Sequence, residues 1–251
     1  MADAAERAGL DAAVPPCQPW LVKDLLRHTG YIHRWAARHI TERPDRVLDG
    51  PPEAEILKGG PADPELLAWF RSGCATLVET LADADPALEC ATFMAAPCPL
   101  AFWARRQAHE TAIHRADAES ASGVIAEYAP DFAADGIDEL IMGFGRRRRY
   151  QPVAGSDGGQ LRVVTTDTGD GWSVGAREGR MQPRRDDGEH PAGYRAADHA
   201  ERGATCTVSG AASGVYLYLW NRADQAQADI TIAGDPDLLV TWQSSLRVRW
   251  S

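Results

Sequence analysis

The hydrophobic pattern of the chain changes near residue 150, and this change limits the possible folds more than any other feature. Ahead of it, apolar residues recur every three to four positions, which predicts four helices over residues 20–41, 64–84, 100–119 and 131–144. Beyond it, glycine becomes frequent, and β-type runs such as LRVVTTD and ADITIAG appear beside two apolar helical segments. The sequence therefore predicts two domains: a four-helix bundle over residues 1–149 and a smaller α+β domain over residues 150–251.

Two polar stretches interrupt these patterns. Residues 177–203 are charged and contain glycine, which predicts a long loop or lid. The run RRRRY, residues 146–150, follows the fourth predicted helix. We interpret its arginines as partners of the helix C-terminus on a solvated face, rather than as contacts to nucleic acid.

Charge and hydropathy limit the partners and the compartment. The 251 residues include 26 lysines and arginines against 36 acidic residues, a net charge of −10 that would repel a polyanion. No stretch approaches the roughly 18 consecutive apolar residues of a membrane helix. The N-terminal run MADAAERAGLDAAVPP lacks the apolar segment of a signal peptide. We therefore expect a cytoplasmic protein that binds neither nucleic acid nor a membrane.

The cysteines give no sign of a disulfide framework or of a thiolate metal site. There are five of them, an odd number, and they are widely spaced without a C-x-x-C pair. We interpret them as thiols in a reducing compartment.

A group of potential metal ligands is found in the segment FWARRQAHETAIHRADAE. Glu110 and His114 are four residues apart, so on a helix they lie only about 40° from each other. His109 and His114 are five apart, about 140°, so they cannot form the histidine pair of an H-E-x-x-H metalloprotease. His28 lies on the apolar stripe of the first predicted helix and could supply a third ligand. Spacing alone leaves the alternative open that His28 is a core histidine and Glu110 and His114 a surface pair.

Three segments resemble a known family. VPPCQPWLVKDLLRHTGYIHRWA and FWARRQAHETAIHRADAE resemble the two signatures of the mycothiol-dependent maleylpyruvate isomerase family, whose bundle belongs to the DinB-like metal-binding superfamily. GAASGVYLYLWNR resembles the helix of that family's smaller C-terminal domain. The three segments occur in the family's order and together span most of the chain.

The resemblance implies a DinB-like four-helix bundle that holds one divalent ion, usually zinc, through His28, Glu110 and His114. An open coordination position would take the thiol of mycothiol, which then adds to a small, possibly anionic electrophile in an isomerase or S-transferase reaction. Arg222, in the segment that resembles the C-terminal helix, would clamp a carboxylate or stabilise an enolate. Alternatively, Arg222 contacts the last carbonyls of its own helix.

The chain also departs from the family pattern. Only about 14 residues precede the first signature, too few for a full bundle helix, so we expect a bundle that is short on one side or a chain that starts late. Gln18 and Pro19 stand where the family has glycine beside the tryptophan. Two other functions stay open: a hydrolase whose metal-bound water is served by Glu119 or Asp117, and a binding or regulatory protein without turnover.

Overall fold

The computed structural model describes residues 1–147, 159–177, 180–186 and 205–245. The chain divides into two compact units, Met1–Ala126 and Glu127–Arg249. Among the described residues, no helix is both long enough and apolar enough to cross a membrane. All five cysteines are described, and none of them forms a disulfide.

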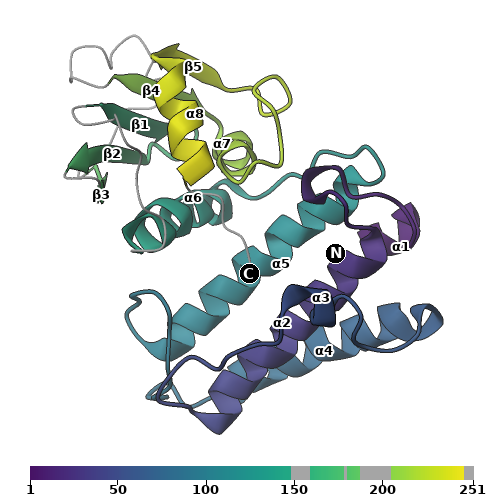
Figure 1. Ribbon diagram of the computed structural model, residues 1–251. Coiled ribbons are helices and arrows are strands. Elements are labelled where there is room, and N and C mark those ends of the chain that lie inside the picture. The colour runs from purple at the N-terminus through teal and green to yellow at the C-terminus, as the bar shows by residue number, and fades with distance from the viewer. Residues whose placement is uncertain (148–158, 178–179, 187–204, 246–251) are drawn as a thin grey trace. The chain divides into compact units, whose positions relative to one another are not determined.

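The first unit is a helical bundle, built of three long helices and one short one; Figure 1 shows their arrangement. The bundle helices are α1 (Ala2–Ala8), α2 (Val22–Glu42), α4 (Asp63–Asp83) and α5 (Pro99–Ser120). A 3-10 turn (Pro15–Cys17) precedes α2, and the short α3 (Glu53–Ile56) interrupts the connection from α2 to α4. The three long helices confirm the predicted segments 20–41, 64–84 and 100–119.

Local features mark the start of each long helix and the end of α2. The side chain of Asp24 accepts a hydrogen bond from the backbone N–H of Leu21, which caps the start of α2. Proline stands in the first turn of both α4 and α5, where its missing N–H costs nothing. Arg43 ends α2 in the left-handed region, with φ 51°.

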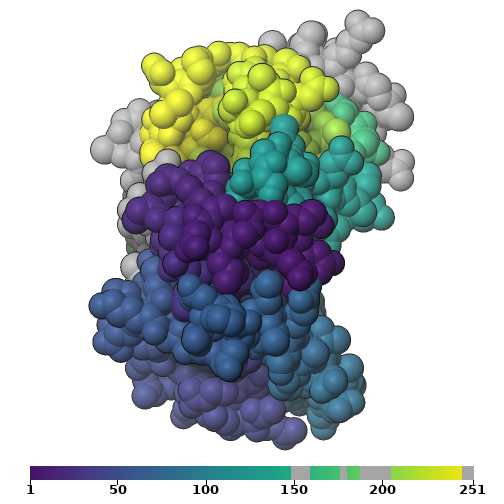
Figure 2. Space-filling view, turned by 90° about the vertical axis from the view of Figure 1, so that its right-hand side faces the viewer, coloured from purple at the N-terminus to yellow at the C-terminus, as the bar shows by residue number. Residues whose placement is uncertain are grey.

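The fourth helix of the bundle is α1, only seven residues long, which packs against α2, α4 and α5. It lies at the surface of the unit, where it forms the darkest purple part of Figure 2. The fourth helix that the sequence predicts, residues 131–144, is α6 (Pro130–Asp138), continued by a π-helical segment (Glu139–Gly143) and a 3-10 turn (Phe144–Arg146). It belongs to the second unit and packs against α7 (Ala212–Leu219).

Because α6 belongs to the second unit, the boundary between the units lies earlier in the chain than the sequence predicts. The sequence predicts domains of residues 1–149 and 150–251, whereas the compact units meet between Ala126 and Glu127. The reason is physical, because hydrophobic periodicity shows that a helix has a buried face but does not show which core that face joins.

The second unit contains a five-stranded sheet in the order β3-β2-β1-β4-β5. The strands β1 and β4 are parallel, and the other three pairings are antiparallel. The strands are β1 (Gln160–Thr165), β2 (Gly171–Arg177), β3 (Arg180–Arg185), β4 (Cys206–Gly210) and β5 (Thr231–Gly234), and a last helix, α8 (Pro236–Ser245), follows them. The predicted bundle with an α+β partner is therefore confirmed as the fold class.

Part of the stretch predicted as a loop is a strand. Within residues 177–203, β3 pairs antiparallel with β2, while residues 187–203 lie outside the described part of the chain. The sequence RMQPRR shows no apolar alternation because β3 is an edge strand with mostly exposed side chains, a position that tolerates Pro183. Of the run RRRRY, Arg146 ends a 3-10 turn and residues 148–150 lie outside the described residues.

Candidate metal centre

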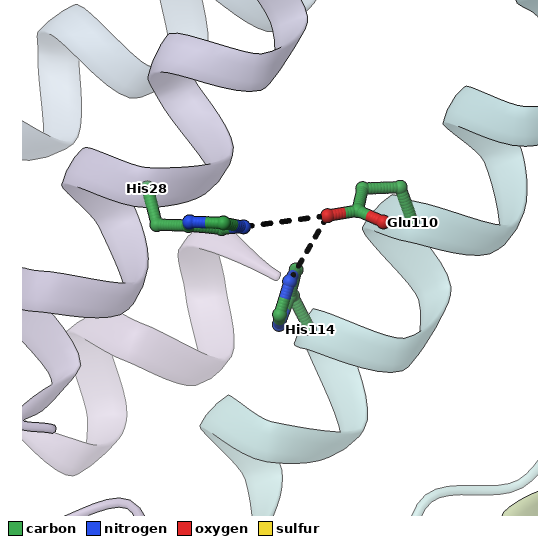
Figure 3. Close-up of side chains that lie close together, drawn as sticks. All are labelled: His28, Glu110 and His114. Carbon is green, nitrogen blue, oxygen red and sulfur yellow. Dashed lines mark hydrogen bonds and ion pairs between the residues drawn. The ribbon is translucent and has the colours of Figure 1, made fainter. Parts of the chain in front are cut away.

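Three potential metal ligands lie together inside the helical unit. His28 comes from α2, and Glu110 and His114 come from successive turns of α5 (Figure 3). One ligand atom from each residue lies within 4.8 Å of the others. The three side chains are almost fully buried, with exposed fractions of 1%, 3% and 6%. The alternative of a surface pair does not hold, since Glu110 and His114 are core residues.

Two of the three distances between ligand atoms match those around a tetrahedral ion. The Nε2 atoms of His28 and His114 lie 3.4 and 3.2 Å from the same oxygen, Oε1 of Glu110. Zinc bonds of about 2.0–2.1 Å at tetrahedral angles place neighbouring ligand atoms about 3.3 Å apart. Two imidazole nitrogens and a carboxylate oxygen are also ordinary zinc ligands. The donor set and its spacing therefore fit a divalent ion.

Further charged side chains contact the outer atoms of these ligands. Arg106 Nη2 donates to Oε2 of Glu110 over 2.7 Å, and Asp117 Oδ2 lies 2.8 Å from Nδ1 of His114. Arg106 and Asp117 are themselves fully buried on α5. Oε1 of Glu53, on α3, lies 3.8 Å from Nδ1 of His28. The atoms that face each other at the centre are thus the two Nε2 nitrogens and one carboxylate oxygen.

These contacts also set the charges of the ligands. Burial raises the pKa of Glu110, but hydrogen bonds from His114 and His28 outweigh burial and hold the pKa well below its ordinary value. Burial lowers the pKa of His114, but its hydrogen bonds to Asp117 and Glu110 raise the pKa to about 9. Glu110 is therefore ionised at neutral pH, the form in which a carboxylate binds a metal.

The other histidines of the helices lie outside the trio. Both ring nitrogens of His39 bind backbone groups: Nδ1 donates to the carbonyl of Trp35, and Nε2 accepts the N–H of Leu48. His109 is buried but does not belong to the potential ligand group. His33 contacts Thr111 Oγ1 through Nε2 over 2.8 Å and so links α2 to α5.

His33 makes the stability of the protein depend on pH. Burial, aided by Arg34 and His114, lowers the pKa of His33 to about 4 from 6.5, although Glu110 acts in the opposite direction. The unfolded chain therefore binds the proton more readily, so stability is complete above pH 6.5 and is lost as the pH falls toward 4. Between pH 7 and pH 4 we expect wild type to lose about 3 kcal/mol more free energy of unfolding than His33→Gln. Urea unfolding of both proteins across this range measures the difference, and parallel pH profiles would contradict it.

Arg222 lies in the second unit, just after α7. Its Nη1 donates to the carbonyl of Trp220 over 2.7 Å, and its backbone N–H donates to Leu217 O. These are the helix-end contacts of the alternative interpretation, in which Arg222 caps its own helix. A role toward a substrate stays a prediction. Glu119, a candidate proton carrier, forms an ion pair with Arg115 at 3.6 Å.

Some residues of the centre could have been found from the sequence, and others could not. Arg106 stands four residues before Glu110, and Asp117 three residues after His114, which are the spacings of facing pairs on a helix. No helical spacing points to Glu53, because it approaches His28 from a separate short helix.

Comparisons with known proteins agree with this architecture. Residues 1–119 match the family model described as the mycothiol maleylpyruvate isomerase N-terminal domain. The chain is similar in fold to a crystal structure of a mutant of the mycothiol-dependent maleylpyruvate isomerase, with a TM-score of 0.57 and 13% sequence identity, over 92% of this chain and 88% of that one. A stereoselective inverting sec-alkylsulfatase from Pseudomonas sp. matches with a TM-score of only 0.28 and 15% identity, over 90% of this chain and 30% of that one. No curated protein matches the sequence.

Proposed function

We propose a metal- and thiol-dependent isomerase or S-transferase activity for this chain, whose residues 1–119 match the family model described as the mycothiol maleylpyruvate isomerase N-terminal domain. The solved structure of similar fold is of a mutant of the mycothiol-dependent maleylpyruvate isomerase. The thiol that the family name indicates is mycothiol, and the substrate would be a small electrophile. The expected absence of nucleic-acid and membrane partners is part of the proposal.

One observation carries the proposal: the convergence of His28, Glu110 and His114 in a buried centre. Three protein ligands leave a coordination position open, as in catalytic rather than structural zinc sites. A divalent ion held there, in our view Zn²⁺, would lower the pKa of an incoming thiol, so that a thiolate nucleophile exists at neutral pH.

The reaction that follows is a reversible addition. The thiolate forms an S–C bond to one carbon of a cis double bond conjugated to a carbonyl, and the electron pair moves to the carbonyl oxygen as an enolate. Rotation about the former double bond and expulsion of the thiolate then give the trans isomer and regenerate the nucleophile. If the adduct is protonated on carbon instead of expelling the thiolate, the product is an S-conjugate, and the enzyme is a transferase.

Metal analysis tests the centre. We expect about one zinc per chain in the purified protein, and loss of that zinc in His28→Ala, Glu110→Ala and His114→Ala, because each removes one of three ligands. Glu119→Gln is the matched control, since it changes a carboxylate on the same helix outside the trio. Equal zinc in all five proteins would contradict the assignment. Turnover of an electrophile without any thiol would favour the hydrolase alternative.

For Arg222 we propose a contact with the carboxylate of an anionic electrophile. Arg222→Gln is then expected to raise KM for a cis-unsaturated carboxylate about 10- to 100-fold, the worth of a hydrogen bond to a charged group. KM for the uncharged methyl ester of the same compound should not change. If the variant alters neither kcat nor KM for the carboxylate, Arg222 serves only to cap its helix.

A further inference from the structure

We propose that Asp117 and Arg106 are positioning residues that select which atoms of His114 and Glu110 bind the ion, an inference that rests on the proposed metal centre. Together they would present Nε2 of His114 and the single oxygen Oε1 of Glu110. The ion would then receive one atom from each of its three ligand residues, and the rest of its coordination sphere would stay open to substrate.

Asp117 acts on the histidine. A carboxylate is an acceptor only, so at 2.8 Å it requires a proton on Nδ1 of His114. In the structure, Nε2 of His114 donates its own proton to Oε1 of Glu110 over 3.2 Å; an ion that displaces this proton would find the lone pair on Nε2, while Asp117 keeps the other proton on Nδ1. Asp117 is fully buried, so no bulk water competes for this contact. The arrangement is the carboxylate–histidine pair that orients metal ligands in proteins.

Arg106 acts on the carboxylate. Its Nη2 donates to Oε2 of Glu110 over 2.7 Å, in a pair whose side chains are 0% and 4% exposed. An oxygen held by a charge-assisted hydrogen bond at this distance is a poor second ligand, which leaves Oε1 to face both histidines. Glu110 would therefore bind through one oxygen, and the position that a second oxygen would take stays available.

Glu53 is a weaker counterpart of Asp117. It faces Nδ1 of His28, but at 3.8 Å, beyond hydrogen-bonding distance, and its side chain is 37% exposed. A contact of this length in partly hydrated surroundings has little influence on the orientation or tautomer of the His28 ring. The inference is thus restricted to the two buried residues of α5, and Glu53→Gln serves as an internal comparison.

The test uses Co²⁺ as a probe ion, titrated into metal-free protein and followed by its visible spectrum. We expect Asp117→Asn to bind Co²⁺ about 10- to 100-fold more weakly, the usual effect of losing such a partner. Asparagine keeps the shape of Asp117 but can donate to Nδ1 as well as accept from it, so the ring is no longer held in one tautomer. Glu119→Gln and Glu53→Gln should bind Co²⁺ within a few fold of wild type.

A second readout separates positioning from general support of the fold. In zinc-loaded wild type, long-range ¹H–¹⁵N spectra should show His114 protonated on Nδ1, and in zinc-saturated Asp117→Asn this population should fall. For Arg106→Met we expect a shifted Co²⁺ spectrum, because Oε2 becomes free to bind. Wild-type affinity and tautomer in Asp117→Asn would overturn the role of Asp117, and an unchanged spectrum in Arg106→Met that of Arg106. If wild type binds no Co²⁺, the proposed function itself fails.

Discussion

Replacing Glu110 by glutamine is expected to lower kcat/KM of the thiol-dependent reaction by about 10³-fold or more. The substitution keeps the shape of the side chain but removes the charged ligand oxygen that both histidines face. Without a bound ion, only a few per cent of a thiol of ordinary pKa is ionised at neutral pH, and no centre holds it against the electrophile. Steady-state kinetics with mycothiol, beside metal analysis of the same samples, measure the loss.

Two controls distinguish the loss of a metal ligand from a general loss of structure. Glu79→Gln, which changes an exposed carboxylate on α4, should retain activity because Glu79 does not belong to the trio. The free energy of unfolding of Glu110→Gln, measured in urea, identifies any loss due to misfolding. If a well-folded Glu110→Gln protein kept more than about a tenth of wild-type kcat/KM, the metal-dependent mechanism would be wrong.

The second large effect is expected at Gly214, in α7. A Cβ atom at this position would lie 2.0 Å from the backbone carbonyl oxygen of Ala228. Because the obstacle is backbone rather than the end of a flexible side chain, the helix and the segment before β5 would have to separate. We expect Gly214→Ala to lower the free energy of unfolding by about 3 kcal/mol, the upper range for overpacking a core. Urea denaturation followed by circular dichroism measures the change.

Gly175 supplies the control for this substitution. It lies on β2 of the same unit, and a Cβ atom built there meets nothing within 4 Å. Gly175→Ala should therefore change the free energy of unfolding by less than about 0.5 kcal/mol. Equal effects of the two substitutions would mean that the close approach of Gly214 to Ala228 does not limit stability.

The helices of the bundle could be predicted because each long helix carries its own periodic apolar face. The sequence could not assign α6 to its unit, since the periodicity of an amphipathic helix does not show which core its apolar face joins. The short α1 contains few apolar residues of appreciable size and shows no periodicity over seven positions. The sequence did not predict the edge strand β3, because a strand with mostly exposed side chains has no alternation of apolar and polar residues.

For the candidate site, the sequence likewise predicts which residues share a helix face but not which helices come together. Glu110 and His114 share a helix, so their spacing alone places them on one face, and His28 stands out as a polar residue on an apolar stripe. That α2 and α5 bring these side chains together is tertiary information, which the sequence supplied only through the family resemblance. Arg106 and Asp117 follow helical spacing, whereas Glu53 depends on where the connection between α2 and α4 folds back.

The parallel pairing of β1 with β4 has a consequence for the order in which the chain acquires its structure. Thr205 donates its N–H to Gln160 O across 45 residues, so the middle of the sheet cannot close until that long segment has been made and its ends have met. The three ligand residues of the first unit all lie before residue 115, so they are synthesised before either end of that segment. During synthesis the ligands of the proposed metal centre would therefore assemble first, before the sheet of the second unit has formed.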